Sequence, residues 1–114
     1  IPATKGLIGA TELGWMKPDA VLVHASRGGI VDEAALAQAL ADGTIGGAAV
    51  DVYADEPPTA DHPLFGLDDA ASDRLILTPH IGGVTRQAWG TLFRTAWDNV
   101  QSAVDGTEIR HRVY

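Results

Sequence analysis

Three side chains able to support proton-transfer chemistry each follow an apolar, strand-like run of this 114-residue sequence: Arg27, Glu56 and His80. Histidine is the one side chain whose ordinary pKa, about 6.5, lets it give and take a proton near neutral pH. A carboxylate beside it fixes its tautomer and favours its charged form. Arginine has a planar fork that pairs with a carboxylate through two hydrogen bonds. Together these residues form a candidate active site.

Each of these residues also has an ordinary explanation by residue type alone. Arg27 fits a solvated loop arginine, His80 a structural histidine at a strand end, and Glu56 a surface acid beside two prolines. Asp55 competes with Glu56 for the role of the carboxylate, although the spacing from Asp51 to the following proline favours Glu56.

Composition bounds the class of protein. Hydrophobic residues make up 46% and charged residues 20% of the chain, which is typical of one small globular domain. The formal net charge of −7 argues against nucleic acid and against an anionic membrane surface as partners. The chain has no cysteine, which is compatible with the cytosol, where we expect the protein. Its histidines and acids show no metal-ligand spacing, so we expect no metal site.

Hydrophobic periodicity predicts an α/β arrangement. We expect strands at residues 20–25, 45–50 and 75–77, the first of them buried on both faces as in a helix-covered parallel sheet. We expect a short helix at 11–16 with Thr11 as its N-cap, and another that begins after Asp32 and runs through Asp42. Apolar residues at three- and four-residue steps from Trp89 predict a helix of about 21 residues ending near Gly106.

The loop between the second and third strands, residues 51–73, is long for a compact domain, so we expect it to be functional and to contain a short turn. In an open parallel sheet, ligands lie beyond the carboxyl ends of the strands. Residues 25–27, Asp51 and residues 78–80 each follow a strand directly. We therefore expect these three segments to gather on one rim of the sheet.

The motifs Arg-Gly-Gly-Ile-Val-Asp-Glu at 27–33, Asp-Val-Tyr-Ala-Asp-Glu-Pro at 51–57 and Thr-Pro-His-Ile-Gly-Gly at 78–83 carry a family resemblance. In this order they resemble the cofactor domain of the D-isomer-specific 2-hydroxyacid dehydrogenases, which include phosphoglycerate dehydrogenases and glyoxylate/hydroxypyruvate reductases. The similarity extends from about Thr4 to about Val104. It implies part of a Rossmann-type, doubly wound parallel sheet, with about three strands, flanking helices and a long C-terminal helix.

The resemblance also implies a place in a larger protein. Residues 1–114 correspond to the C-terminal portion of a dinucleotide-binding domain, with the phosphate-loop half and the substrate domain lying outside this sequence. No Gly-x-Gly-x-x-Gly occurs in the chain. We therefore expect the chain alone to be inactive and to bind a dinucleotide weakly.

Residue roles follow from the resemblance, residue by residue. Arg27 matches the substrate-binding arginine, His80 the catalytic acid/base, and Glu56 the carboxylate that holds the histidine. The positions that match the NAD-binding side are Ala25, Ser26, Arg27, Asp51, His80, Gly82 and Gly83. Asp51 fits an ordinary strand-end turn equally well. NADP is not excluded as the cofactor, and His24 departs from the asparagine common in the family.

The resemblance favours an oxidoreductase that transfers hydride between NAD and a small D-2-hydroxy or 2-oxo acid, and we expect a homodimer. One alternative is a non-catalytic cofactor sensor or corepressor with the same fold. Another is a structural fragment that has meaning only within the whole protein. The presence of Arg27, Glu56 and His80 together favours the enzyme, because a sensor has no need of a proton-transfer pair.

Overall fold

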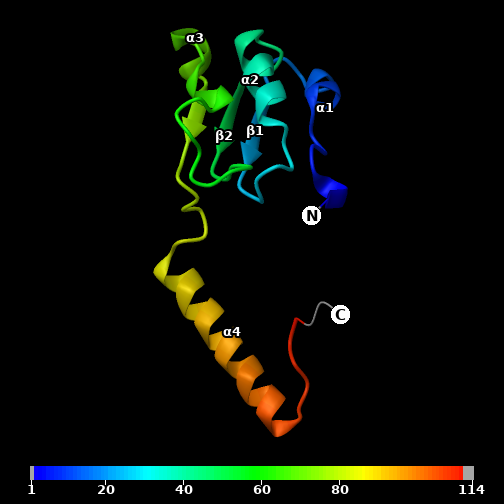
Figure 1. Ribbon diagram of the computed structural model, residues 1–114, viewed down its shortest axis with the longest axis vertical. Helices are drawn as coiled ribbons and strands as arrows, with labels where there is room; N and C mark the ends of the chain where they lie inside the picture. The colour runs from blue at the N-terminus through cyan, green and yellow to red at the C-terminus, as the bar shows by residue number, and fades with distance from the viewer. Residues whose placement is uncertain (1, 112–114) are drawn as a thin grey trace. The chain divides into compact units, whose positions relative to one another are not determined.

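The computed structural model describes residues 2–111, which fall into two compact units divided between Ile81 and Gly82 (Figure 1). The first unit contains, in chain order, η1 (Pro2–Thr4), α1 (Ala10–Gly14), β1 (Val21–His24), α2 (Glu33–Ala41), β2 (Gly47–Val50), η2 (Pro63–Phe65), α3 (Asp69–Ser72) and β3 (Leu75–Leu77). The second unit contains α4 (Arg86–Asp105).

The three strands form one parallel sheet in the order β1-β2-β3. His24 lies opposite Val50, and Val50 lies opposite Leu77. All three strands therefore end at one level, and the segments that follow them leave the sheet at the same rim. The predicted α/β class, the three strands and their parallel direction are confirmed.

Only one face of the sheet is buried within the first unit. The core combines side chains of that face with those of the helices and loops, namely Leu13, Val31, Leu36, Ala37, Ala39, Leu40, Ile45, Ala48, Val50, Tyr53, Leu64 and Ala71. On the other face Val21, Val23 and Ile76 are 62%, 71% and 65% exposed. The prediction that the first strand is buried on both faces is wrong for the residues described, because the core helices all pack on one side of the sheet.

The helix α2 begins and ends where the sequence predicts. The Asp32 carboxylate accepts hydrogen bonds from the backbone N–H groups of Ala34 and Ala35, both at 3.0 Å, which satisfies amides that lack a partner in the first turn. Gly43 follows the helix with a φ of +68°, a left-handed conformation that glycine adopts without steric cost. A sharp turn then leads into β2.

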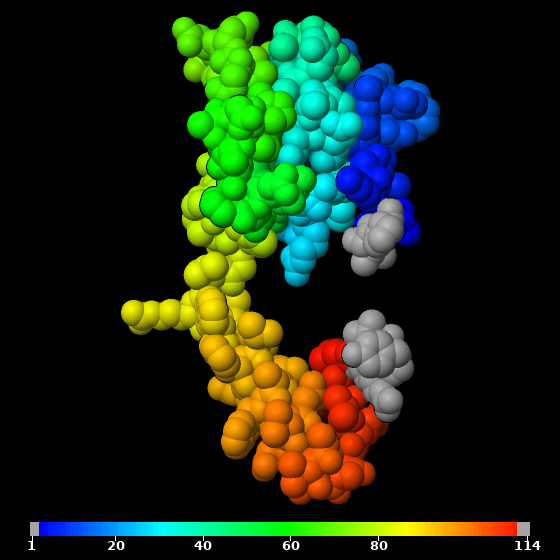
Figure 2. Space-filling view, in the orientation of Figure 1, coloured from blue at the N-terminus to red at the C-terminus, as the bar shows by residue number. Residues whose placement is uncertain are grey.

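The helix α1 differs from its prediction. Its N-cap is Gly9, and Thr11 lies inside the first turn. The carboxylate of Glu12 accepts a hydrogen bond of 2.9 Å from the Gly9 amide, so an acid inside the helix satisfies the amide of the N-cap residue. The helix packs beside α2, as the adjoining blue and cyan segments show in Figure 2.

The helix α4 has the length and the C-terminal end that the sequence predicts. Thr85 caps it by accepting a hydrogen bond of 3.0 Å from the Ala88 amide, and Gly106 ends it with a φ of +68°. Its predicted apolar stripe is exposed, with Trp89 at 45%, Phe93 at 63% and Trp97 at 65%. Within the described residues, no helix is both long enough and apolar enough to cross a membrane.

His24 is a buried titratable group, 5% exposed, at the end of β1. Its Nδ1 lies 3.4 Å from the Ser26 hydroxyl, and its Nε2 has no hydrogen-bond partner among residues 2–111. Burial lowers the pKa of His24 below its ordinary 6.5, and the negative charge of Glu33 opposes that shift. Folding therefore favours the neutral imidazole.

This burial predicts a pH dependence of stability. As pH falls through 6.5, the unfolded chain binds a proton at His24 before the folded chain does, so the free energy of unfolding decreases by at most about 1.4 kcal/mol per pH unit. Above that pH the contribution is fully present. Urea unfolding between about pH 5 and pH 8 should show this slope, and His24→Asn should remove it. An equally steep decrease in the variant would assign the slope to another group.

Candidate active site

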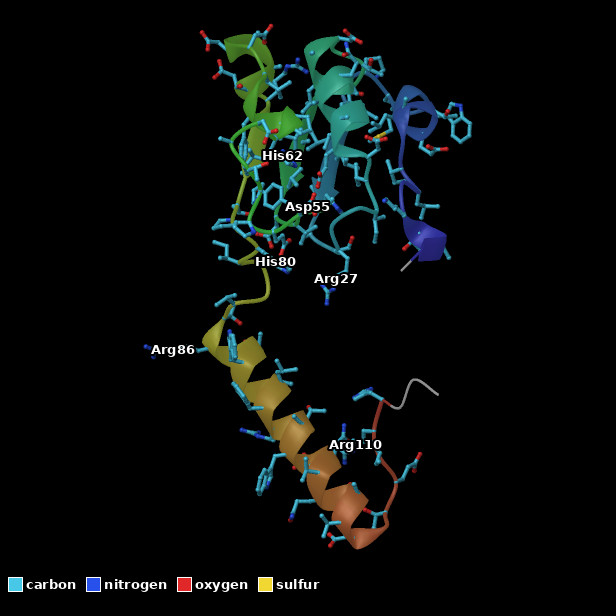
Figure 3. The ribbon with its side chains drawn as sticks, viewed as in Figure 1. Arg27, Asp55, His62, His80, Arg86 and Arg110 are labelled. Carbon is cyan, nitrogen blue, oxygen red and sulfur yellow. The ribbon has the colours of Figure 1, made fainter. Side chains whose placement is uncertain are left out.

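The predicted gathering of segments at one rim is present. The Asp51 amide donates to the His24 carbonyl at 2.9 Å, and the Thr78 amide donates to the Val50 carbonyl at 3.0 Å. The residues just after β1, β2 and β3 therefore lie side by side beyond the sheet. Figure 3 shows Arg27 and His80 at this same end of the first unit.

His80 and Glu56 form a hydrogen-bonded pair on this rim. The Nδ1 atom of His80 lies 2.7 Å from Oε2 of Glu56, so Nδ1–H donates to the carboxylate. The side chains are 44% and 37% exposed, respectively. This contact, together with a 3.0 Å hydrogen bond from the Tyr53 amide to Oε1, lowers the pKa of Glu56 below its ordinary 4.5. The predicted pairing is therefore observed, and it involves Glu56 rather than Asp55.

The backbone around His80 is held in an uncommon conformation. His80 has a φ of +54°, in the left-handed region that costs a residue with a Cβ about 1–2 kcal/mol. Asp51 accepts hydrogen bonds at Oδ1 from the Thr78 hydroxyl and from the Ile81 amide. The Tyr53 hydroxyl donates to the Thr78 carbonyl at 3.0 Å. These contacts on both sides of His80 offset the strain and orient its ring.

The pair opens into a cavity of about 320 Å³, which is large enough for a small organic acid. It is lined by Tyr53, Glu56, Pro57, Pro58, Pro79 and His80. The prolines form rigid apolar walls, and the imidazole and carboxylate supply the polar groups. Asp55 lines a different cavity of about 430 Å³, together with Lys5 and Gly28.

Arg27 lies on the same rim but does not contact the pair in the described structure. Its side chain is exposed, and its Nη1 donates to the Ser26 carbonyl at 2.7 Å. The next residue, Gly28, fits tightly against the opposite loop, because a Cβ added there would lie 1.7 Å from the Tyr53 carbonyl oxygen. Gly28 thus fixes where the Arg27 segment passes the loop that carries Glu56.

The other predicted cofactor positions divide between the two units. Ala25 and Ser26 directly follow β1 on the rim, and Asp51 directly follows β2. Asp51 is buried and holds the segment after β3 through long-range contacts, rather than through the local strand-end turn considered from the sequence. Gly82 and Gly83 are the first two residues of the second unit.

Three residues near the site were not identified from the sequence: Glu33, Tyr53 and His62. Burial raises the pKa of Tyr53 above its ordinary 10.0, and the charges of Asp51, Glu33 and Glu56 add to the shift. Tyr53 therefore stays protonated and able to donate its hydroxyl hydrogen bond. Glu33 and Tyr53 lie inside the motifs at 27–33 and 51–57. Their roles and that of His62 could not be read from the sequence, because their contacts join segments that are far apart along the chain.

A family model described as the NAD-binding domain of D-isomer specific 2-hydroxyacid dehydrogenases matches residues 1–82. The chain is 49% identical over 105 residues to a glycerate dehydrogenase of Methylorubrum extorquens, covering 92% of this chain and 32% of that protein. It is 40% identical over 116 residues to a D-3-phosphoglycerate dehydrogenase of Archaeoglobus fulgidus, covering 99% of this chain and 21% of that protein. The chain thus spans about a third or less of these relatives.

Solved structures share the fold. A D-isomer specific 2-hydroxyacid dehydrogenase from Xanthobacter autotrophicus Py2, in complex with NADPH and MES, superimposes with a TM-score of 0.82 at 30% identity, over 100% of this chain and 44% of the other. A glyoxylate reductase from Paecilomyes thermophila gives a TM-score of 0.81 at 30% identity, over 99% and 33% of the two chains. The Rossmann-type fold class is therefore confirmed.

The close approach of Gly28 to the Tyr53 carbonyl predicts that a larger residue at position 28 greatly lowers the stability of the fold. Gly28→Ala should lower the free energy of unfolding by at least about 3 kcal/mol, because the Tyr53 carbonyl must move away from the added methyl group. Gly29→Ala is the matched control: it meets no atom closer than 4.0 Å and bears only the strain of a φ of +78°, about 1–2 kcal/mol. Denaturant unfolding of both variants measures the difference. Equal costs would contradict the proposed packing.

Proposed function

The chain belongs to the family of D-isomer specific 2-hydroxyacid dehydrogenases, and on this basis we propose an activity for the protein that contains it. That protein transfers hydride between NAD(H) and a small D-2-hydroxy or 2-oxo acid. The observation that carries the proposal is the Glu56–His80 pair, which lies at the carboxyl end of the sheet beside a cavity of about 320 Å³.

In this proposal His80 moves the substrate proton. Its Nδ1–H is bound to Glu56, which leaves Nε2 to take the proton of a substrate hydroxyl and to return it in the reverse direction. The Glu56 carboxylate stabilises the imidazolium that forms, and the lowered pKa of Glu56 keeps that carboxylate charged. The nicotinamide, when bound, accepts or supplies the hydride.

Arg27 is assigned to the carboxylate of the substrate. Its guanidinium is exposed on the rim. Among the described residues it hydrogen-bonds only to the neighbouring Ser26 carbonyl, a local contact that a bound substrate could replace. Besides Arg27 and His80 themselves, we assign the nicotinamide side to Ala25, Ser26, Asp51, Gly82 and Gly83. The rim fits such a group, because small side chains follow β1 there and leave room for a planar ring. The substrate within the 2-hydroxy acid class and the choice between NAD and NADP depend on residues outside this chain.

We further propose that residues 1–114 form the C-terminal portion of the dinucleotide-binding domain of a longer, cytosolic, homodimeric protein. Three observations support the domain assignment: the small share of the relatives that the chain spans, the lack of a Gly-x-Gly-x-x-Gly, and the exposed sheet face of Val21, Val23 and Ile76. The exposed stripe of α4, which includes Trp89 and Phe93, is the surface we assign to a second copy or to the rest of the protein.

The acid/base role of His80 predicts that its substitution reduces turnover far more than cofactor binding in the complete protein. His80→Ala should lower kcat for 2-oxo acid reduction by about 100-fold to 10,000-fold. The other two ionisable side chains that line the cavity cannot replace it, because the pKa of Glu56 is lowered below 4.5 and the pKa of Tyr53 is raised above 10.0. The Kd for NADH should change far less, by under about threefold, since most cofactor contacts lie elsewhere and binding does not require proton transfer. Steady-state kinetics and NADH fluorescence titration measure the two effects.

His111→Ala, a histidine in the second unit, is the control and should leave both quantities unchanged. Unchanged turnover in His80→Ala would reject the acid/base assignment. A complete protein that binds NADH but reduces no 2-oxo acid would instead favour the sensor or corepressor interpretation.

The domain assignment predicts weak cofactor binding by the isolated chain. Without a glycine-rich turn at a helix N-terminus to bind the pyrophosphate, residues 1–114 should bind NADH at least about 100-fold more weakly than the complete protein. The exposed apolar surface should also make the chain self-associate. A calorimetric titration with NADH and a mass measurement in solution test both points. Tight binding by a monomer would show that the phosphate site lies within this chain.

A further inference from the structure

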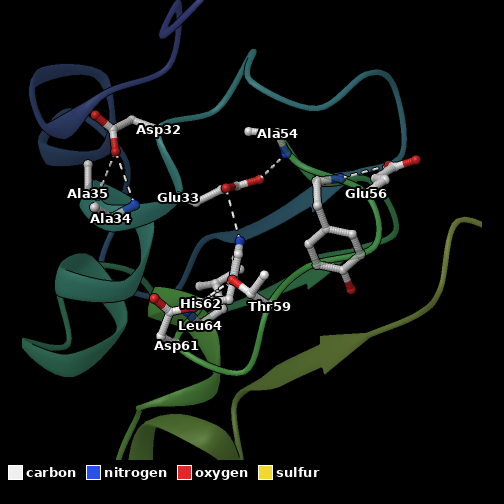
Figure 4. A network of polar contacts seen from close by, with 11 residues as sticks. Asp32, Glu33, Ala34, Ala35, Ala54, Glu56, Thr59, Asp61, His62 and Leu64 are labelled. Carbon is white, nitrogen blue, oxygen red and sulfur yellow. Dashed lines mark hydrogen bonds and ion pairs between the residues drawn. The ribbon is translucent and has the colours of Figure 1, made fainter.

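Glu33, the first residue of α2, joins two parts of the loop between β2 and β3. Its side chain is only 12% exposed. One carboxylate oxygen, Oε1, accepts a hydrogen bond of 2.7 Å from the Ala54 amide. The other, Oε2, lies 3.0 Å from Nε2 of His62 (Figure 4). A single half-buried carboxylate thus holds the loop at residues 54 and 62.

The contacts of His62 determine where its proton lies. The Leu64 amide donates to Nδ1 at 3.3 Å, so Nδ1 carries no proton. The proton therefore lies on Nε2 and is donated to Glu33. The ring is also packed edge-on against Tyr53, with centroids 5.5 Å apart, and its side chain is 7% exposed. His62 has both nitrogens bonded and holds the Glu33 carboxylate in one orientation.

This pair is connected to the candidate active site through the backbone at Tyr53. The Ala54 amide donates to Glu33, and the preceding Tyr53 amide donates to Oε1 of Glu56 at 3.0 Å. The other oxygen of Glu56 holds His80. Glu33 and Glu56 thus bind the N–H groups of two consecutive peptide units, which meet at the Cα of Tyr53. A shift of the backbone at Tyr53 would therefore disturb both hydrogen bonds.

We propose that Glu33 and His62 are positioning residues, which fix the Tyr53–Ala54 peptide so that Glu56 meets His80 in the geometry needed for proton transfer. The role in turnover rests on the function proposed above, whereas the effect on the Glu56–His80 hydrogen bond does not. Glu33 touches neither His80 nor the cavity beside it. It therefore acts on the reaction only through the loop.

The change Glu33→Gln tests this with nearly constant shape. Glu33 faces two donors, the Ala54 amide and His62 Nε2–H. A glutamine presents one oxygen and one NH₂ group, so one donor must lose its acceptor. In the complete protein, kcat should fall by about 10-fold to 100-fold, the range seen when residues that orient a functional group are lost. KM for the cofactor should change by less than about threefold.

The second readout does not depend on activity. The Nδ1 proton of His80, held by Glu56, should give a downfield proton resonance in NMR spectra of the complete protein. Glu33→Gln should shift or broaden it, because Glu56 no longer has a fixed position. His62→Gln should have the same two effects, and the double variant should be no worse than the more affected single variant, because the two residues act as one unit.

Glu12→Gln is the matched control. Glu12 also accepts a hydrogen bond from a backbone amide, that of Gly9, but at the start of α1 and away from the loop. It should leave kcat and the His80 resonance unchanged. If Glu33→Gln fails to fold, Glu33→Asp decides the question, since it keeps the charge and is too short to reach both partners.

The outcomes separate the two proposals. A folded Glu33 variant with wild-type kcat and a wild-type His80 resonance would overturn the inference and leave the pair with a role in stability alone. A complete protein without dehydrogenase activity would reject the proposed function, and the resonance would still show whether the pair positions Glu56.

Discussion

The rim of the sheet depends on the position of the backbone at Tyr53, where two consecutive peptide units meet. Their N–H groups, those of Tyr53 and Ala54, are bound by carboxylates from different parts of the chain, Glu56 and Glu33 respectively. The Tyr53 carbonyl lies so close to Gly28 that no larger residue fits there. The loop after β1, the N-terminus of α2 and the loop after β2 are therefore fixed relative to one another at this point, and the functional side chains take their positions from it.

Electrostatics near Tyr53 favour one arrangement of protons. Burial raises the pKa of Tyr53, and the nearby charges of Asp51, Glu33 and Glu56 add to the shift, so its hydroxyl remains a donor to the segment after β3. Glu56 stays ionised because it accepts hydrogen bonds from His80 and from the backbone. The same hydrogen bond to Glu56 orients the His80 ring. The contacts that hold the loop in place therefore also set the orientation of the histidine.

Much of the fold was predictable from local patterns. The boundaries of α2 follow from Asp32 and Gly43, whose capping roles depend only on their neighbours in sequence. The length of α4 follows from its apolar repeat in the same way. The two errors have different causes. Thr11 was predicted as the N-cap, but Glu12 accepts a hydrogen bond from the Gly9 amide, and the helix starts earlier. Val21 and Val23 were expected to be buried because an apolar run does not reveal which face of the sheet the helices cover.

For the site, the sequence by itself determined which residue types follow each strand, and so which side chains reach the rim. It favoured Glu56 over Asp55 by spacing without showing the contact, and it assigned no role to Glu33 or His62. Only the tertiary structure decided these points, because a hydrogen bond such as that between Glu56 and His80 joins residues 24 positions apart and depends on the path of the loop between them. Helix capping and hydrophobic periodicity depend on residues a few positions apart, so they can be predicted from the sequence. Which carboxylate pairs with a histidine depends on distances that are set only after the strands have paired.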